Sequence, residues 1–395
     1  MATVEQVKER IVEEVKGLHP RLIEISHEIH DNPEIGFQER RAVALLTDEL
    51  EQNGFSVERG MAGMETSFVG SWGEGKPVVG FLAEYDALRG IGHACGHNLI
   101  ATWALGAGIA LKRATQGMDG TIKVFGTPAE EGGGGKVLMA EAGLFRGLDA
   151  AIMMHPRDQT FLDRGSLAVS HWNIEFFGKS SHASAAPEKG ISALDALLQV
   201  FFSVNAFRQM MKPIGRIHGC ILKGGDAPNV IPDYTLAEFL VRSRDQDYLE
   251  ELEKKFLDIV QAASLATGAR SEVRKGSGYK VRVSNRALVE ALRENMVGLG
   301  ITWDTPEEGA VGSSDIGDVS QLVPTIHPYM AICEKGIPNH NPQFAVEAAS
   351  PLADEQIALG ATLLSWTGAD VLLRPDLRER LRSTFRDQLG RDPQE

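Results

Sequence analysis

The 395-residue chain contains little cysteine and no long apolar run. Its three cysteines, Cys95, Cys220 and Cys333, are odd in number and far apart, which argues against a disulfide framework and fits a reducing compartment. No apolar run approaches the roughly 18 residues that a membrane-spanning helix needs. The N-terminal segment also lacks the apolar core of a signal peptide. The sequence therefore predicts a cytoplasmic protein that does not span a membrane.

The chain contains fewer basic than acidic residues. Lysine and arginine number 40 against 54 aspartates and glutamates, which gives a formal net charge of −14. A general nucleic-acid binder needs a basic face, so we expect no nucleic-acid partner. The chain is also too long for one compact core, and two domains are expected.

Two patterns of hydrophobicity divide the chain. Predicted strands cover residues 77–85, 121–131 and 150–156, and predicted helices cover residues 99–114 and 134–145. This alternation predicts an α/β fold with a mostly parallel, doubly wound sheet. From about residue 168, alternating segments interleave with two long helices, which is typical of a small α+β insertion. We therefore expect a main domain formed by residues 1–167 and 279–395, with an inserted domain at 168–278.

Polar residues follow several of the predicted strands. Those with metal-binding or acid–base side chains are Asp86, Cys95, His97, Glu130, Glu131 and His155. Because binding groups gather beyond the carboxyl ends of parallel strands, we expect these side chains at one edge of the sheet. Singly, such a histidine is usually a satisfied core residue, and such a cysteine a small buried hydrophobe. Four of these groups on one edge, with His340 far downstream, favour a metal site.

The adjacent acids Glu130 and Glu131 lie in "PAEEGGGG". They fit either a solvated acidic loop or a catalytic pair in which the two carboxylates have different roles. In the latter, one carboxylate binds a cation and the other takes a proton from a water that the cation activates. The glycine run is not a phosphate loop, because no Ser or Thr follows Lys136 and the required upstream glycine is missing.

A covalent role for Cys95 is the rival hypothesis. A nucleophilic thiol needs a base within hydrogen-bond reach, and neighbours in a turn often point apart. No local signature of the papain or caspase type surrounds Cys95. The metal-ligand hypothesis is therefore preferred.

Seven motifs occur in order over most of the chain: "EYDAL…GHACGHNL", "GTPAEEGGGG", "MMHP", "GKSSHASAAPEKGISALDAL", "GGDAPNVIPD", "GSSDIGDVS" and "NHNPQF". Together they resemble the M20 family of metallopeptidases and amidohydrolases. The resemblance is to the branch of aminobenzoyl-glutamate hydrolases, N-acyl-amino-acid amidohydrolases and M20-domain dipeptidases. It implies a catalytic domain with a dinuclear metal site, interrupted by a lid domain that dimerises.

The resemblance also implies roles for particular residues. The implied metal ligands are Cys95, His97, Glu131, His155 and His340, and the implied substrate-binding residues are His182, Asn229 and Arg242. Glu130 matches the general base, and Asp86 matches an acid that orients a ligand histidine. Two divalent metal ions are implied; thiolate and imidazole ligands suit zinc, with manganese or cobalt as alternatives. His327 is interpreted as a structural or pocket-lining residue.

The chain departs from the family pattern at two positions. Asn98 stands where many relatives carry aspartate, and Glu84 stands where others read "RADxDAL". Neither departure removes an implied ligand, so the resemblance still implies an amide hydrolase. Its substrate would be an N-acyl amino acid or a dipeptide-like amide with a free carboxylate. The alternative is a catalytically silent binding or scaffold protein, which would have no chemical need for Glu130 or a complete ligand set.

A homodimer is expected through the inserted domain. The segment "HWNIEFFG", residues 171–178, is interpreted as an aromatic-rich edge strand, which monomers rarely leave unpaired. The resemblance supports the same expectation.

Overall fold

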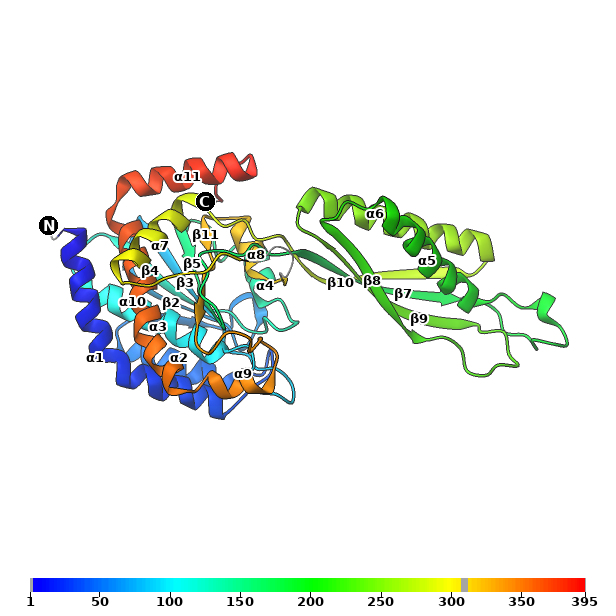
Figure 1. Ribbon diagram of the computed structural model, residues 1–395, viewed down its shortest axis with the longest axis horizontal. Coiled ribbons are helices and arrows are strands. Elements are labelled where there is room, and N and C mark those ends of the chain that lie inside the picture. The colour runs from blue at the N-terminus through cyan, green and yellow to red at the C-terminus, as the bar shows by residue number, and fades with distance from the viewer. Residues whose placement is uncertain (1–2, 307–311, 395) are drawn as a thin grey trace. The chain divides into compact units, whose positions relative to one another are not determined.

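The computed structural model describes residues 3–306 and 312–394. The chain forms two compact units (Figure 1). Unit 1 comprises Met1–Gly165, Arg282–Val311 and Asp315–Glu395, and unit 2 comprises Ser166–Val281 with Gly312–Ser314. Unit 2 is therefore an insertion, and the predicted boundaries after residues 167 and 278 lie close to the observed ones.

Unit 1 is built on a mixed sheet of order β1-β2-β4-β3-β5-β11. Its strands are β1 (Ser56–Arg59), β2 (Phe68–Glu74), β3 (Val78–Ala83), β4 (Gly120–Gly126), β5 (Ala150–Ile152) and β11 (Thr325–Ile326). Strands β4, β3, β5 and β11 run parallel, whereas β1 and β2 are antiparallel additions at one edge. The short strands β6 (His155–Arg157) and β12 (Tyr329–Ala331) form a separate parallel pair. The expected mostly parallel α/β sheet is confirmed.

Helices cover both faces of this sheet. One core packs α1 (Val4–Asp31), α2 (Arg40–Gln52), α3 (His97–Ala114), α7 (Arg286–Gly298), α10 (Pro351–Leu373) and α11 (Pro375–Leu389). The other core holds α4 (Gly135–Glu141) and α8 (Ile316–Ser320). Phe81 belongs to the first core and its neighbour Leu82 to the second, as the alternation of side chains along a strand requires. A short helix, α9 (Pro342–Glu347), precedes α10. The fold is therefore doubly wound.

Helix α10 is long and apolar enough to cross a membrane by length and composition, and it is the one such helix among residues 3–306 and 312–394. Its apolar window is 72% buried inside unit 1, where α10 packs against α1 and α3. Core packing accounts for its composition.

Unit 2 is a four-stranded antiparallel sheet of order β10-β7-β9-β8. Its strands are β7 (Ala168–Phe177), β8 (Gly215–Lys223), β9 (Tyr234–Ser243) and β10 (Arg270–Tyr279), and its helices are α5 (Ala193–Phe207) and α6 (Gln246–Thr267). The prediction that "HWNIEFFG" is an edge strand is wrong, because it lies in β7, which pairs on both sides. Its side chains Trp172, Ile174 and Phe176 are buried in the core that includes the two helices. The edges are β8 and β10.

Candidate metal centre

A tight turn places Cys95 and His97 on either side of Gly96. Gly96 has a φ of +75° and precedes the first residue of α3. A Cβ at Gly96 would lie 2.6 Å from Cγ of Pro156, so only glycine fits this close approach. Cys95 consequently packs against the segment after β5, where its Sγ lies 3.4 Å from Nε2 of His155.

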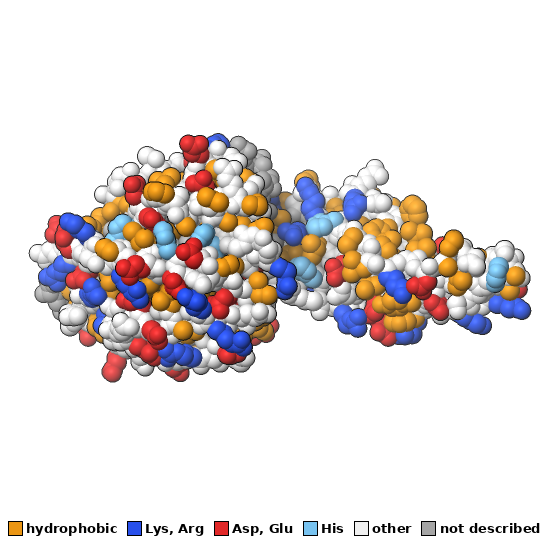
Figure 2. Space-filling model, turned by 90° about the horizontal axis from the view of Figure 1, so that it is seen from below, with side chains coloured by type: hydrophobic (Ala, Val, Ile, Leu, Met, Phe, Trp, Pro, Cys, Tyr) orange, Lys and Arg blue, Asp and Glu red, His pale blue; other side chains and the backbone are white. Residues whose placement is uncertain are grey.

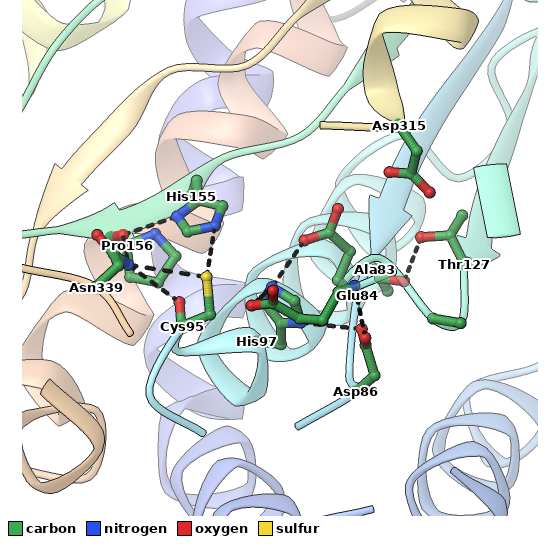
Figure 3. A network of polar contacts seen from close by, with 12 residues as sticks. Ala83, Glu84, Asp86, Cys95, His97, Thr127, His155, Pro156, Asp315 and Asn339 are labelled. Atoms are coloured by element: carbon green, nitrogen blue, oxygen red, sulfur yellow. Dashed lines mark hydrogen bonds and ion pairs between the residues drawn. The ribbon is translucent and has the colours of Figure 1, made fainter. Parts of the chain in front are cut away.

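Hydrogen bonds from the Nδ1 atoms orient the rings of His97 and His155 (Figure 3). Nδ1 of His97 lies 3.0 Å from Oδ1 of Asp86, and Nδ1 of His155 lies 2.8 Å from the carbonyl oxygen of Pro156. A carbonyl or carboxylate oxygen can only accept, so both Nδ1 atoms donate. The Nε2 atoms then hold the lone pairs with which a histidine binds metal.

A strained turn after β4 presents the paired acids. Ala129 has a φ of +57°, which is uncommon for a residue with a side chain. Its N–H donates to Oε1 of the fully buried Glu39 at 2.8 Å, and this contact holds the strained backbone in place. The turn positions Glu131, whose N–H donates to Oδ2 of Asp86 at 3.0 Å. Asp86 thus braces both His97 and Glu131.

His340 completes the group from far along the sequence. Its backbone N–H donates to the carbonyl oxygen of Ala94 at 2.8 Å, which ties it to the cysteine turn. Its Nε2 lies 3.2 Å from Oε1 of Glu131. His340 also has a positive φ, +63°, so two non-glycine residues at this site are held in the left-handed region.

All five predicted ligands converge in unit 1. Three overlapping groups have potential ligand atoms within 4.8 Å of one another: Cys95 with His97 and His155, Cys95 with Glu131 and His340, and His97 with Glu130 and Glu131. The predicted roles within this metal-ligand cluster remain predictions, but the structure brings the side chains together.

The electrostatics of the cluster fit a bound cation. Burial would lower the pKa of His97, but Cys95 and Asp86 more than offset burial and raise it well above its usual value, so a cation that binds at Nε2 would displace a proton there. Burial and the charge of His97 lower the pKa of His155 to about 3, which keeps its Nε2 lone pair available. Nε2 of His97 is buried without a hydrogen-bond partner among the residues that the structure describes. Oε1 of Glu131 is also buried and faces the imidazole nitrogens of His340 and His97. A divalent cation would satisfy both atoms, and the sulfur, nitrogen and oxygen donor set suits zinc or a similar ion.

A buried charge cluster beside this site was not predicted. The ammonium of Lys136 is fully buried and contacts Glu84 Oε1 and, at 2.8 Å, Asp315 Oδ1. Carboxylate oxygens of Glu84, Glu130 and Asp315 lie within 4.8 Å of one another. The other oxygen of Glu84 lies 3.4 Å from Nε2 of His97. The unusual glutamate at position 84 was the one sequence feature that could have indicated this cluster. Lys136 gave no such indication, because a lysine after a glycine run is normally a solvated residue at the start of a helix.

The departure at Asn98 has a structural explanation. Its Nδ2 donates to Oγ of Ser26 and to the carbonyl oxygen of Ala348, both at 2.9 Å. These contacts join α1, α3 and the segment before α10. Asn98 therefore stabilises packing in unit 1 and contributes no donor atom to the metal-ligand cluster described above.

The three predicted substrate-binding residues lie in unit 2. His182 is exposed and forms a β-bridge with Val230, next to Asn229. Arg242 lies near the opposite end of β9, partly buried, with Nη1 3.4 Å from Oγ of Ser313. The structure therefore brings His182 and Asn229 together but places Arg242 apart from them within unit 2.

Fold and site together define a class: an α/β enzyme with an inserted α+β unit and a cluster of thiol, imidazole and carboxyl groups at the carboxyl edge of its sheet. The model of peptidase family M20/M25/M40 matches residues 77–358. The chain belongs to this family, as its motifs predict.

Individual relatives agree with this assignment. The human Xaa-Arg dipeptidase is 36% identical, and the match covers 98% of this chain and 93% of the human protein. A p-aminobenzoyl-glutamate hydrolase chain of Escherichia coli is 30% identical over 77% of this chain and 68% of its own. A solved dinuclear metal-binding M20 peptidase from Bacillus subtilis has the same fold, with a TM-score of 0.72 at 21% identity over 90% of this chain and 99% of that one. The chain is accordingly a hydrolase of amide bonds.

Proposed function

We propose that the protein hydrolyses dipeptides or N-acyl amino acids that carry a free carboxylate, using two divalent metal ions, with zinc as the expected metal and manganese or cobalt as alternatives. The convergence of Cys95, His97, Glu131, His155 and His340 beside Glu130 carries this proposal. The names of the relatives support the substrate class. An Xaa-Arg dipeptide, p-aminobenzoyl-glutamate and N-acetyl-cysteine all place an amino acid on the nitrogen side of the amide.

The geometry supports different roles for the paired acids. A carboxylate oxygen of Glu131 lies within 4.8 Å of potential ligand atoms of Cys95, His97 and His340. Glu130 comes within that distance of His97, and its other neighbours in such groups are all acids. This difference supports Glu131 as a ligand and Glu130 as the general base. Bound metal ions would polarise the scissile carbonyl and acidify the attacking water.

Glu130 acts on the proton of that water. Burial, with the charges of Glu84 and Asp315 next, raises the pKa of Glu130 well above its usual value. Cations held by the neighbouring ligands would favour the ionised form of Glu130. As a carboxylate of raised basicity, Glu130 accepts the proton of the attacking water and then passes it to the leaving amine. Asp86 holds His97 in the tautomer that binds metal.

The silent-scaffold alternative lacks an observation in its favour. Maintaining a strained turn at Ala129 and buried atoms without partners costs stability. A protein that only binds has no chemical need for either.

A metal-content and turnover assay tests the proposed function. We expect the purified protein to contain divalent metal and to hydrolyse at least one of alanyl-arginine, p-aminobenzoyl-glutamate and N-acetyl-cysteine. A chelator should abolish hydrolysis, and added zinc, manganese or cobalt should restore it. A metal-free protein without turnover on this panel contradicts the proposal. Turnover that survives chelation, with a trapped acyl-thioester at Cys95, would support the nucleophile hypothesis instead.

A homodimer through unit 2 is the second part of the proposal. Ile221 and Leu222 on edge strand β8 are exposed, and Phe202 on α5 is 70% exposed. Hydrophobic side chains also gather on the face of unit 2 that Figure 2 shows. An unpaired edge strand with exposed apolar side chains favours pairing with a second copy.

The positions of the substrate-binding residues support the same dimer. Strand β9 runs about 26 Å from Tyr234, near the loop with Asn229, to Arg242 at roughly 3.3 Å per residue. A dipeptide spans only about 7 Å. One copy of unit 2 therefore cannot place His182, Asn229 and Arg242 on one substrate, so two subunits must contribute if all three bind it.

We expect light scattering to show a dimer, and mixed subunits to complement each other. Neither His182→Ala nor Glu130→Ala should be active alone, whereas their mixture should recover part of the activity after subunit exchange. A monomer at working concentration argues against the dimer. No recovery despite proven exchange shows that His182 acts within its own subunit.

We also propose a cytoplasmic location. The three cysteines are unpaired, and a ligand thiol at Cys95 must stay reduced, which the cytoplasm supports.

A further inference from the structure

The histidines beside the metal-ligand cluster include His97, His155 and His327, and the partner of Nδ1 distinguishes these three. His97 and His155 both donate from Nδ1, to Asp86 and to the carbonyl of Pro156. His327 has the opposite arrangement. Its Nδ1 lies 2.7 Å from Nη1 of Arg282, and a guanidinium can only donate.

The fold places His327 as it places His155. Each histidine follows a parallel strand, β5 or β11, and precedes a proline. The two segments are joined because the N–H of His155 donates to the carbonyl of Pro328 at 2.9 Å. The rings of His155 and His327 lie 5.5 Å apart between centroids. His327 is therefore a direct neighbour of the metal-ligand cluster.

Buried contacts hold the guanidinium of Arg282. It donates to Oδ1 of Asp163 at 2.9 Å, to the carbonyl of Gly165 at 2.8 Å and to the hydroxyl of Tyr329 at 3.2 Å. Arg282 is 4% exposed. Its position is thus fixed from several sides, which fixes the donor that faces His327.

The tautomer of His327 follows from this contact. Because Nδ1 accepts from Arg282, the ring is neutral and its single proton is on Nε2. His327 is 2% exposed, and its Nε2 has no hydrogen-bond partner among residues 3–306 and 312–394. A buried N–H without an acceptor destabilises the protein unless a partner binds there. In this tautomer Nε2 has no lone pair for a metal, so His327 is a donor beside the ligands rather than a further ligand.

We propose that His327 is a substrate-binding residue whose Nε2–H donates to the scissile carbonyl oxygen of the amide, and that Arg282 is the positioning residue that fixes this tautomer. The proposal rests on the proposed amide hydrolysis. The donor and the carbonyl oxygen would meet beside His155, at the sheet edge where substrates of such folds bind. A donor held in a fixed position beside the oxygen that gains negative charge contributes most in the transition state.

Two substitutions at position 327 separate donation from packing. His327→Asn keeps an acceptor for Arg282 near the position of Nδ1 but removes the Nε2 donor. His327→Gln keeps an N–H donor near the position of Nε2. We expect His327→Asn to lower kcat about 10²–10³-fold with metal content and melting temperature unchanged, and His327→Gln to lose at least tenfold less.

His19→Asn is the matched control. His19 belongs to unit 1 and its Nε2 contacts the backbone carbonyl of Asp354 at 2.8 Å, away from the cluster. Its kcat should stay within about twofold of the parent. If His327→Asn also stays within this range, or if both substitutions at 327 lose metal and activity equally, His327 packs against His155 and the proposal is wrong.

A measurement without turnover tests the tautomer itself. The ¹⁵N chemical shifts of the His327 ring in the metal-free protein should report a protonated Nε2 and an unprotonated Nδ1, with the signals assigned by their loss in His327→Gln. A protonated Nδ1, or an imidazolium, would falsify the proposal. This result stands even if no substrate of the panel is hydrolysed, so failure of the proposed function and failure of this inference are distinguishable.

Discussion

Glu130→Gln is expected to lower kcat by about 10²–10⁴-fold while the metal content stays at the level of the parent. Glutamine has nearly the size of glutamate but cannot accept the proton of the attacking water. The predicted ligand set is untouched, because Glu131 rather than Glu130 approaches Cys95 and His340. Elemental analysis of the purified variant, with kinetics at saturating metal, measures both quantities. Substrate affinity should change little.

Glu131→Gln is the matched control. It makes the same chemical change at the adjacent residue, but it removes a carboxylate whose Oε1 lies 3.2 Å from Nε2 of His340 and 4.0 Å from Nε2 of His97. This variant should lose metal first, and excess metal should restore part of its activity because the base remains. Metal lost from the Glu130 variant and retained by the Glu131 variant would mean that the two roles are reversed.

Local sequence patterns predicted the part of the site that follows strand ends. β3, β4 and β5 are apolar runs, so the positions of Asp86, Glu131 and His155 after them were readable from the sequence. Parallel strands end at one edge, and this places such residues together. His340 has no such local signal. It was a candidate by residue type alone until the family resemblance implied its role, because its approach to Glu131 depends on a loop that folds back from a distant part of the chain.

Other features depend on contacts that no local pattern contains. The order of strands in an antiparallel sheet is not encoded in the alternation of one strand, so β7 looked like an edge although β10 pairs with it. Strand β10 itself is rich in charge and gave no strand signal. The orientation of His327 follows from Arg282, which lies 45 residues away in sequence.

The buried ammonium of Lys136 could not be predicted for the same reason. Its partners come from separate elements: Glu84 follows β3, and Asp315 immediately precedes α8. Burial alone would lower the pKa of Lys136, but the charges of Asp315 and Glu84 more than offset it and raise the pKa above its usual range. Lys136 therefore stays charged and neutralises carboxylates that would otherwise repel one another in the interior.

Lys136→Met should lower the free energy of unfolding of the metal-free protein by about 3–5 kcal/mol. Methionine fills most of the space, but it leaves Glu84 and Asp315 buried without their cation. Chemical denaturation followed by tryptophan fluorescence reports mainly on unit 1, because Trp103 lies in its core and Trp366 packs against that core. Lys16→Met, at an exposed position of α1, is the control and should change the free energy by less than about 0.5 kcal/mol.

A triple variant separates lost charge from lost packing. Lys136→Met combined with Glu84→Gln and Asp315→Asn removes the uncompensated charges together with the ammonium. Replacing a whole buried ionic group by neutral side chains is often close to neutral for stability, whereas removing one partner is costly. The triple variant should therefore be more stable than Lys136→Met alone, although it carries two further substitutions. If it is equally or less stable, the cost of Lys136→Met arises from packing around α4 rather than from the unpaired carboxylates, and Lys136 does not hold this part of unit 1 together by its charge.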